Sequence, residues 1–376
     1  MAGFRVVICG GGIAGVEGLL RLRRLAGDQV EVTLIAPEEE LVVRPLTVLE
    51  PFTGKVAPRY PITRIAADTG AQWLRDSLAW VDRAERVVHT SGGGQVPYDA
   101  LLLALGGGQR PASPGLDVFT GHDGGALYAG VVESIEAGAI AQLVFLLPPG
   151  PVWPLPLYEL ALLTAKRARG SGRAPELRFV IPGPQPLAPF GGDAGEVMTE
   201  LLAAAGITLY TNATARLTAP HTLVLDPTGT LLHPDRTITV PTISGPNIRG
   251  IPGFAADRFL HVDEYCRVRD TDGRVFAAGD ATDLPVKHGG IGAQQADTAA
   301  AGISHLAGVG PAPERLRPRI NATLLTGADP LYLSAYLIDG RGWHATFYEA
   351  PPWPAGEKVI AEELAPYLQG LDDSTP

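Results

Sequence analysis

Short apolar runs, most of them ended by glycine or proline, alternate along this chain with amphipathic stretches of helical length. The run from Arg5 to Cys9 predicts a buried strand, and the apolar spacing from Ile13 to Leu25 predicts a helix that ends before Gly27. A second β-rich run from Val30 to Ala36 follows. The first part of the chain therefore predicts a strand–helix–strand unit of an α/β fold.

The next stretch predicts a hairpin inserted into this unit. Residues Trp73 to Val81 predict one strand and Arg86 to Thr90 a second, and the glycine-rich turn from Ser91 to Gly94 follows. The apolar run from Asp99 to Leu105 then predicts a strand that returns to the first sheet.

Residues 111 to 240 repeat the alternation of strands and helices, which predicts a second parallel α/β domain inserted within the first. From Pro241 the chain is expected to rejoin the first sheet. We therefore expect a first domain of residues 1–110 and 241–310, an inserted domain of residues 111–240 and a C-terminal segment of residues 311–376. The elements expected in the inserted domain are strands at Ala141 to Leu147, Leu177 to Ile181 and Ile207 to Tyr210, and helices at Leu127 to Ala139, at Leu157 to Arg169 and from an Asp193 cap to Ala205.

The C-terminal segment predicts a small α+β layer. LRPRINATLLTG and LYLSAYLI alternate as strands do, and the charges of GEKVIAEELAPYLQGL fit a helix on a protein surface better than one on a lipid face. The segment is rich in Trp and Pro and is a candidate oligomer contact, which leaves a homodimer open.

The break between the first strand and its helix has the spacing G-x-G-x-x-G at Gly10, Gly12 and Gly15. Gly10 permits a tight turn, Gly12 lets backbone approach a pyrophosphate, and Gly15 allows close packing of helix and strand. The helix N-terminus would face the anion. A carboxylate after the second strand should hold the ribose, and Glu38 is the first acid there; a solvated acidic turn is the alternative.

Composition narrows the function classes. The net charge of −10 and pI near 5.3 provide no basic stripe, so we exclude nucleic acid as a partner. The apolar runs are shorter than the roughly 18 residues of a membrane-spanning helix, and the first strand begins too close to Met1 for a signal peptide. We therefore expect a cytoplasmic protein without a transmembrane segment. The eight histidines show no metal-ligand spacing, and no metal is predicted.

The motifs GGGIAG, YDALLLALGG and VFAAGDAT, in this order, resemble those of the two-dinucleotide-binding-domain flavoproteins, the pyridine nucleotide–disulfide oxidoreductase superfamily. Within it, the chain is similar to the branch of sulfide:quinone oxidoreductase, flavocytochrome c sulfide dehydrogenase and type II NADH:quinone oxidoreductase, over roughly residues 4 to 310. The resemblance implies an α/β fold, an FAD-binding Rossmann-like domain with a second Rossmann-like domain inserted and a small C-terminal α+β segment. The implied cofactor is FAD.

By this resemblance Asp280 would bond to the ribityl chain of FAD, and Gly279 would leave space for it; a helix cap is the alternative for Asp280. Arg44 and Pro45 would lie beside the isoalloxazine ring, and Lys287 with its following helix would stabilise negative charge on the flavin. The residues predicted to bind the cofactor are Gly10, Gly12, Ile13, Ala14, Gly15, Glu38, Arg44, Pro45, Ala104, Gly106, Gly279, Asp280, Lys287 and Gly292.

The chain departs from these relatives in the inserted domain. Where NAD(P)H-oxidising members carry a second G-x-G-x-x-G, it reads PPGPVWPLPLYELA, and proline removes N–H donors that a phosphate would need. The next strand end, Ile181 to Pro184, lacks an acid for a ribose. Trp153 stands where the sulfide-oxidising members place a cysteine. The only cysteines are Cys9, in a buried strand, and Cys266, so a dithiol mechanism would require Cys266 to approach the ring.

These observations favour an FAD-dependent oxidoreductase that passes electrons directly between flavin and a small-molecule carrier, with a quinone-like acceptor preferred. The residues predicted to serve the chemistry are Lys287, Glu159, Trp153, Tyr158 and Gln294, the last from a QQ pair that resembles one in type II NADH:quinone enzymes. Glu159 would relay a proton if burial raises its pKa; an exposed helix glutamate is the alternative. Two other functions stay open: an NAD(P)H:quinone-type oxidoreductase with an unusual nicotinamide loop, and a non-catalytic flavin-binding interaction or sensor protein.

Overall fold

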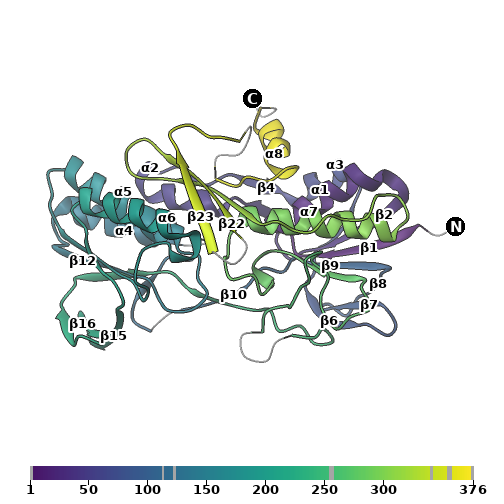
Figure 1. Cartoon of the computed structure of the whole chain (residues 1–376), viewed down its shortest axis with the longest axis horizontal. Helices are drawn as coiled ribbons and strands as arrows, with labels where there is room; N and C mark the ends of the chain where they lie inside the picture. The colour runs from purple at the N-terminus through teal and green to yellow at the C-terminus, as the bar shows by residue number, and fades with distance from the viewer. Residues whose placement is uncertain are drawn as a thin grey trace.

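The computed structural model describes residues 3–111, 114–121, 124–253, 258–338, 342–353 and 358–373. Two five-stranded parallel sheets lie next to each other along the long axis of the molecule, and helices cover both (Figure 1). The predicted α/β class with two Rossmann-like domains and a C-terminal antiparallel segment is confirmed. The residue bounds predicted for the domains remain predictions.

The first sheet has the strand order β20-β9-β1-β2-β5. A strand from late in the chain, β20, thus pairs with β9 from the first third and forms one edge of the sheet. The strands are β1 (Phe4–Cys9), β2 (Val30–Ile35), β5 (Gln72–Leu74), β9 (Ala100–Leu103) and β20 (Val275–Ala277).

The alternating side chains of β1 bury both faces of this sheet. Val6 and Ile8 pack in the cluster beneath the helices α1 (Ile13–Ala26) and α7 (Gly289–Leu306). Val7 and Cys9 pack on the opposite face, where a small antiparallel sheet covers them. Helices α1 and α7 lie side by side (Figure 1), and α1 extends one residue beyond its predicted end.

The hairpin prediction needs one correction. The stretch from Trp73 to Val81 is not one strand: β5 ends at Leu74 in the first sheet, and β6 (Leu78–Asp82) starts a separate three-stranded sheet with β7 (Val87–Thr90) and β8 (Gln95–Pro97). Asp76 enforces the break, because its carboxylate accepts hydrogen bonds from the backbone N–H groups of Ser77 and Gly92. One apolar run therefore serves two sheets.

The second sheet has the order β11-β18-β12-β13-β14. Its strands are β11 (Asp117–Val118), β12 (Gln142–Leu146), β13 (Glu176–Val180), β14 (Thr208–Tyr210) and β18 (Arg236–Thr239), and its helices are α4 (Gly124–Ala137), α5 (Leu155–Gly170) and α6 (Gly192–Ala204). The predicted cap of α6 is wrong: Gly191 occupies that position, and Asp193 lies in the first turn of the helix.

A three-stranded antiparallel sheet, which the sequence pattern did not predict, lies on the outer face of the second sheet. Leu223 and Leu225 alternate inward from its central strand and pack against Val144 and Val180. The strands are β15 (Thr214–Ala219), β16 (Thr222–Asp226) and β17 (Thr230–Leu232). They were missed because their apolar positions are interrupted by threonine, proline and histidine.

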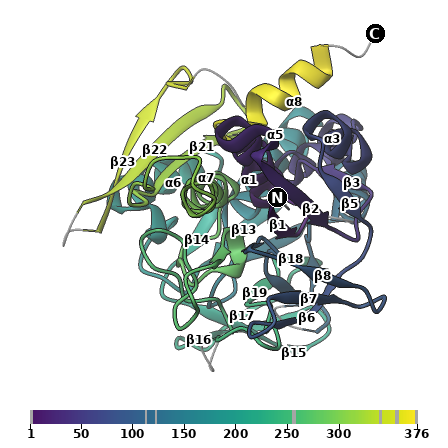
Figure 2. The ribbon, with the colours of Figure 1, turned by 90° about the vertical axis from the view of Figure 1, so that its right-hand side faces the viewer.

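The C-terminal residues form an antiparallel sheet and a helix. The two predicted strands are confirmed as β21 (Arg319–Leu324) and β22 (Leu331–Ile338), and β23 (Gly342–Tyr348) is added to them. Figure 2 shows this sheet beside α6 and α7, with α8 (Leu364–Asp373) extending away from it near α1 and α3. The predicted C-terminal helix is shorter than expected, and its first two residues lie outside the described residues.

The remaining short elements connect the layers. Strands β10 and β19 pair where the chain crosses between the two domains, and β3 pairs with β4 beside the end of β2. Their bounds, with those of the other short helices, are β3 (Glu40–Val42), β4 (Arg59–Pro61), β10 (Gly108–Arg110), β19 (Thr242–Ser244), α2 (Glu50–Thr53), α3 (Ile62–Thr69) and the 3-10 turns Gly27–Gln29, Arg44–Leu49, Ala188–Phe190 and Gly279–Ala281.

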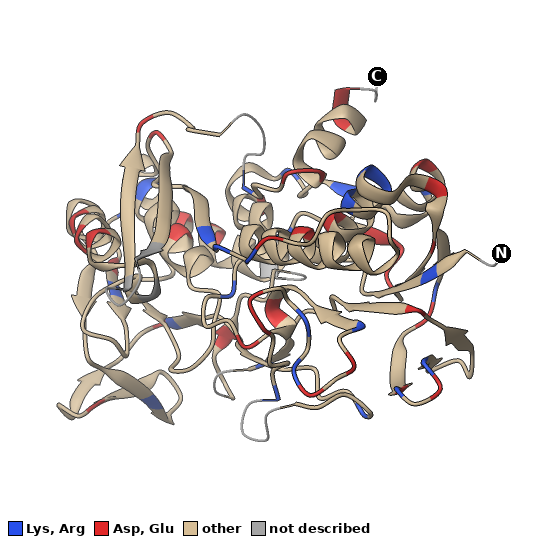
Figure 3. Ribbon diagram, turned by 45° about the vertical axis from the view of Figure 1, so that its right-hand side comes forward, with Lys and Arg blue, Asp and Glu red and all other residues tan. Residues whose placement is uncertain are grey.

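Acidic and basic residues are interspersed along the ribbon of both domains (Figure 3). In the described part of the chain, no helix is both long enough and apolar enough to cross a membrane. The same residues contain no group of three or more side chains placed to hold a metal ion.

Candidate cofactor and active site

A cavity of about 690 Å³ opens at the carboxyl ends of β1, β2, β9 and β20, which is where ligands bind in open α/β sheets. Both ends of the sequence contribute to it. Most of its lining residues lie within the segments 10–14, 35–45, 104–109, 240–243 and 278–292. The others are Arg59, Arg75, Ser77, Leu78, Phe119, Thr120, Trp153 and Pro156. Of the residues predicted to bind the cofactor, all line this cavity except Gly15.

The three glycines of the first motif differ in what surrounds them. A Cβ on Gly10 would lie 2.2 Å from the carbonyl oxygen of Ala104, and a Cβ on Gly15 would lie 1.9 Å from that of Gly10. Gly12 instead faces open space in the cavity. Gly10 and Gly15 therefore allow strand and helix to approach, while Gly12 keeps the start of α1 open to a phosphate.

Three consecutive acids follow β2, and the structure separates their roles. Glu39 forms an ion pair with Arg75, and Glu40 lies 3.7 Å from the guanidinium of Arg59. Within the described residues, Glu38 has no such partner, and it lines the cavity. This placement fits the predicted contact with a ribose.

Asp280 lies at the other end of the cavity, directly after β20. Among the residues that the structure describes, none donates a hydrogen bond to its carboxylate. Burial raises the pKa of this carboxyl, and the cations Lys287 and Arg44 partly oppose the shift. A desolvated acceptor without a protein donor fits a ligand hydroxyl, so the residues present fit the dinucleotide that the motifs imply.

The turn that carries Asp280 is held from below by the second glutamine of the QQ pair. Gln295 Oε1 accepts a hydrogen bond from the backbone N–H of Gly279 at 2.9 Å, and its Nε2 donates to the hydroxyl of Thr282 at 2.9 Å. Gly279 has φ of +79°, which favours glycine, and a Cβ there would meet the side chain of Ala14 at 3.3 Å.

Lys287 is buried at the cavity wall. Its Nζ donates to the backbone carbonyls of Thr282 at 2.6 Å and Asp280 at 3.3 Å, and it lies 3.7 Å from the ring centroid of Phe259. These contacts fix a positive charge next to Asp280. The neighbouring Arg44 also lines the cavity, where it interacts electrostatically with Glu38 and Asp280.

His288 caps the helix α7 that begins at the cavity. Its Nδ1 accepts the backbone N–H of Gly290 at 3.1 Å, so the neutral ring carries its proton on Nε2. Burial, assisted by the charge of Lys358, lowers the pKa of His288 to about 4. The imidazole is therefore neutral near pH 7.

Trp153 lines the cavity from the proline-rich loop of the second domain. The following helix begins at Leu155 with Pro154 as its cap, and the backbone N–H of Leu157 bonds back to the Pro154 carbonyl. Pro154 and Pro156 have no N–H. The first turn of α5 therefore has few donors to offer a phosphate.

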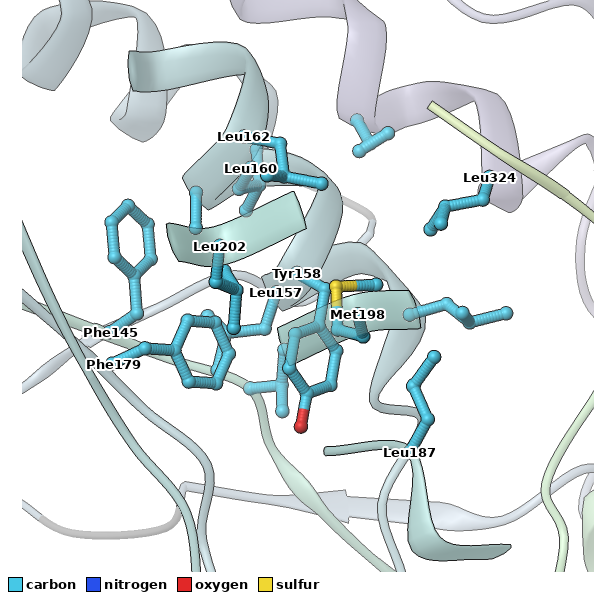
Figure 4. Packing of buried hydrophobic residues seen from close by; sticks show 14 of the residues in the cluster. Phe145, Leu157, Tyr158, Leu160, Leu162, Phe179, Leu187, Met198, Leu202 and Leu324 are labelled. Atoms are coloured by element: carbon cyan, nitrogen blue, oxygen red, sulfur yellow. The ribbon is translucent and has the colours of Figure 1, made fainter. Parts of the chain in front are cut away.

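Two residues predicted for the chemistry lie elsewhere, and their placement corrects the prediction. Tyr158 is fully buried in the core of the second domain, where its ring stacks on that of Phe179 with 4.5 Å between the ring centroids and lies among Met198 and Leu187 (Figure 4). Gln294 binds both backbone groups of Arg319 and thereby joins α7 to β21. Neither lines the cavity: the lining residues Pro156 and Gly292 each lie two positions earlier, on another face of the same helix.

Glu159 is buried, not exposed, and burial raises the pKa of its carboxyl. It forms a buried ion pair with Lys358, and it accepts a hydrogen bond from the backbone N–H of Leu325 at 3.0 Å. Lys358 Nζ also donates to the carbonyl of Thr323 at 2.9 Å. The pair lies behind the cavity: Lys358 lines a small space that shares Trp153 and His288 with the main cavity.

Both cysteines are completely buried, and neither lines the cavity. Desolvation raises the pKa of the Cys9 thiol to about 12 and raises that of Cys266 further. Cys266 therefore does not approach the cofactor position, and the described residues place no reactive thiolate there.

Three residues of this region were not predicted from the sequence: His288, Lys358 and Phe119. His288 directly follows Lys287, and its position before a glycine-rich helix start was a usable capping signal. Lys358 gave no signal, because its partner is 199 positions away in sequence.

Comparison with known proteins agrees with this geometry. Residues 4–137 match the family model described as pyridine nucleotide-disulphide oxidoreductase. The chain is 26% identical over 104 residues to mitochondrial sulfide:quinone oxidoreductase of Mus musculus, a match that spans 27% of this chain and only 23% of that protein. It is 27% identical over 296 residues to an NADH dehydrogenase-like protein of Mycobacterium tuberculosis, which covers 73% of this chain and 72% of the relative.

Solved structures show the same fold. The sulfide:quinone oxidoreductase of Aquifex aeolicus superposes with a TM-score of 0.82 at 18% identity, covering 92% of this chain and 87% of that one. A ferredoxin reductase of Rhodopseudomonas palustris gives a TM-score of 0.67 at 18% identity, with 92% and 88% covered. With its ordered glycine and aspartate motifs around one cavity, the chain is similar over residues 4–137 to the pyridine nucleotide-disulphide oxidoreductase family, and it shares the fold of the Aquifex aeolicus enzyme.

Proposed function

We propose that this protein passes electrons directly between a bound FAD and a small apolar carrier, with a quinone as acceptor. The observation that carries the proposal is the chemistry of the cavity wall opposite the glycine motif. That wall is apolar and contains no thiol; its residues include Phe119, Trp153, Pro156, Val240, Pro241 and Ile243. Such a surface favours a flat, uncharged molecule over a charged one.

The residues at the remaining walls of the cavity would hold FAD in a single orientation. Gly12 and the start of α1 would face the pyrophosphate, and Glu38 and Asp280 would bind the ribose and ribityl hydroxyls. When bound, FAD supplies two-electron redox chemistry through its isoalloxazine ring. Lys287 and the N-terminus of α7 would stabilise negative charge at that ring.

If no pair of cysteines relays electrons to the flavin, the electrons must pass directly from the donor molecule to the flavin ring. The buried positions of Cys9 and Cys266 argue against the sulfur relay that paired cysteines provide. The quinone assignment draws on the names of two relatives as sulfide:quinone oxidoreductases and on the apolar wall. The proposed function involves neither a nucleic acid nor a membrane as a partner.

A second candidate is an NAD(P)H:quinone-type oxidoreductase. The relative that matches the larger share of the chain is named NADH dehydrogenase-like, which favours this alternative. The loop before α5 argues against it, because Pro154 and Pro156 remove N–H donors where a nicotinamide dinucleotide would need them.

Anaerobic titration of the FAD-loaded protein, followed by flavin absorbance, separates these functions. We expect slow or no bleaching by NADH and NADPH, and rapid bleaching by a soluble quinol that reverses when oxidised quinone is added. Rapid bleaching by NADH would replace the proposal with the second candidate. A flavin that no donor reduces and that turns over no artificial quinone would indicate a flavin-binding interaction or sensor protein.

A further inference from the structure

A cluster of charged side chains outside the cavity fastens the last part of the chain to the first domain. We call residues 358–373 the C-terminal strap. The strap runs from Lys358, which pairs with Glu159 of the second domain, to α8, which packs Leu364 and Leu368 against the cluster around α1. Figure 2 shows α8 above α1 and α3. The strap therefore joins the two domains.

The N-terminus of α8 is capped by a buried carboxylate from α1. Glu17 is 0% exposed; its Oε1 accepts the backbone N–H of Glu363 at 2.9 Å and its Oε2 accepts that of Leu364 at 2.6 Å. Both oxygens are used in this way only while Glu17 is ionised, because a protonated carboxyl gives up one acceptor. Docking of the strap thus depends on a buried negative charge.

A second carboxyl lies against the first. Asp297 of α7 lies within hydrogen-bonding reach of Glu17, and this contact raises the pKa of Asp297 and opposes the rise that burial causes in the pKa of Glu17. Its Oδ1 is buried without a hydrogen-bond partner, and the nearest cation is the Nε of Arg21 at 3.9 Å. Because Glu17 is buried and the side chain of Asp297 is only 16% exposed, the two adjoining carboxyls cannot both ionise readily, and one proton stays between them.

The other charged groups facing the pair come from α1 and the strap. Arg21 binds Glu362 at 2.7 Å and Glu363 at 2.8 Å, and Arg24 contacts the same two acids. With Glu17 and Asp297, the cluster holds four carboxyls against two guanidinium groups. The negative excess favours retention of a proton on one carboxyl.

We propose that Glu17 and Asp297 share one proton, and that this proton keeps the C-terminal strap docked; when it is lost at alkaline pH, the strap is released from α1 and α7. Release would also separate Lys358 from Glu159 and Val359 from Gly289, which lines the cofactor cavity. The pair would thus act as a pH-sensitive latch beside the cofactor site. The inference concerns the chain alone and does not require the proposed function.

The pH window follows from the pKa of Asp297, which burial and the neighbouring Glu17 raise to about 9. An acid whose pKa is higher in the docked state stabilises docking at low pH, and that stabilisation is lost as pH rises towards the docked pKa. Docking should weaken by up to about tenfold for each pH unit up to about pH 9, and then become independent of pH.

Hydrogen–deuterium exchange of the full-length protein between pH 6 and pH 10 tests the latch. The measured quantity is the protection factor of the amides of the strap, corrected for the intrinsic pH dependence of exchange. We expect wild-type protection to fall with rising pH and then level off, while protection in β1 and β9 stays constant. A wild-type strap whose protection is flat from pH 6 to pH 10 would overturn the proposal.

Three variants complete the test. In Asp297→Asn the amide donates to Glu17 at every pH, so protection should be high and flat. In Glu17→Gln one acceptor is lost, so protection should be lower, with little slope. The exposed control Asp28→Asn should keep the wild-type curve. An Asp297→Asn protein with the wild-type slope refutes the shared proton, and tryptic cleavage after Lys358 provides an independent measure of strap release.

Discussion

At the scale of single residues, the three glycines of the first motif look equivalent in the sequence but do different work. Gly10 has φ of +115° and no room for a Cβ, Gly15 has no room either, and Gly12 has space around it. Gly10 and Gly15 are therefore needed for packing of the strand and helix, and Gly12 is needed to leave room for the ligand. A pair of substitutions can separate them.

We predict that Gly12→Val leaves the free energy of unfolding nearly unchanged but weakens FAD binding by at least about tenfold, because the new side chain enters the pyrophosphate position. Gly10→Ala should instead destabilise the fold by roughly 1–3 kcal/mol, because alanine is strained at positive φ and meets Ala104. Fluorescence titration with FAD and urea denaturation measure the two effects. The control is Gly130→Ala, in open space on α4. Unchanged FAD affinity in Gly12→Val would contradict the assigned phosphate position.

A second prediction concerns Lys287. At about 4 Å and an effective dielectric near 20, one cation contributes about 4 kcal/mol before screening by solvent, and about 1.4 kcal/mol corresponds to 30 mV for a two-electron couple. Lys287→Met should therefore lower the flavin reduction potential by tens of millivolts. Spectroelectrochemical titration measures it, with the exposed Lys55→Met as control. A potential equal to that of wild type would remove Lys287 from this role.

At the scale of elements, strands with continuous apolar runs were predictable and pairing partners were not. β1, α1 and β2 followed from periodicity and glycine spacing alone, and their observed ends lie close to the predicted ones. The strands β15–β17 were missed because alternation with threonine is a weak signal, and Asp76 divided one predicted strand between two sheets.

The candidate site shows the same division between local and distant information. Glycine and aspartate motifs located most of the cavity wall, because backbone geometry at strand ends is encoded locally. The motifs did not show which face of each helix turns toward the site. Tyr158 and Gln294 belong to motifs that reach the site, yet their own side chains point into packed regions. The partner of Glu159 could not be found, because a single lysine in a tail carries no spacing pattern.

The ion pair between α5 and the strap yields a prediction at this scale. Lys358→Met would leave Glu159 buried without its cation, which should cost about 3–5 kcal/mol of stability. The loss of stability should grow as pH rises. Because burial raises the pKa of Glu159, the folded variant holds a proton on this carboxyl that the unfolded chain releases. Thermal and urea unfolding at pH 5 and pH 8 measure it.

The matched control is the double variant Glu159→Leu with Lys358→Met, which replaces the pair with apolar side chains and should recover most of the lost stability. If the single variant unfolds with wild-type stability at both pH values, the pair has no structural role.

At the scale of the whole molecule, one cavity is assembled from segments at both ends of the sequence. Gly10 and Glu38 come from the start of the chain, Asp280 and His288 from its last third, and Trp153 from the second domain. A ligand that contacts all of them stabilises the native state as a unit, since the unfolded chain has no such site.

We predict that FAD at one hundred times its dissociation constant raises the free energy of unfolding by about 2.7 kcal/mol, or roughly 3 °C in Tm for a chain of this size. Riboflavin and AMP, each of which reaches only one part of the cavity, should give smaller shifts at equal concentration. Differential scanning fluorimetry of FAD-stripped protein measures this. Equal shifts with AMP alone and with FAD would argue against a cavity that binds the whole dinucleotide.

The edge position of β20 also has a consequence during protein synthesis. On the ribosome, the loop with Gly10 and Gly12 emerges early. β9 cannot pair with β20 until residue 275 has been synthesised. At 5–20 residues per second this interval is on the order of ten to thirty seconds. The second domain has time to fold during this interval. Binding of the coenzyme would therefore be one of the last steps in the synthesis and folding of the chain.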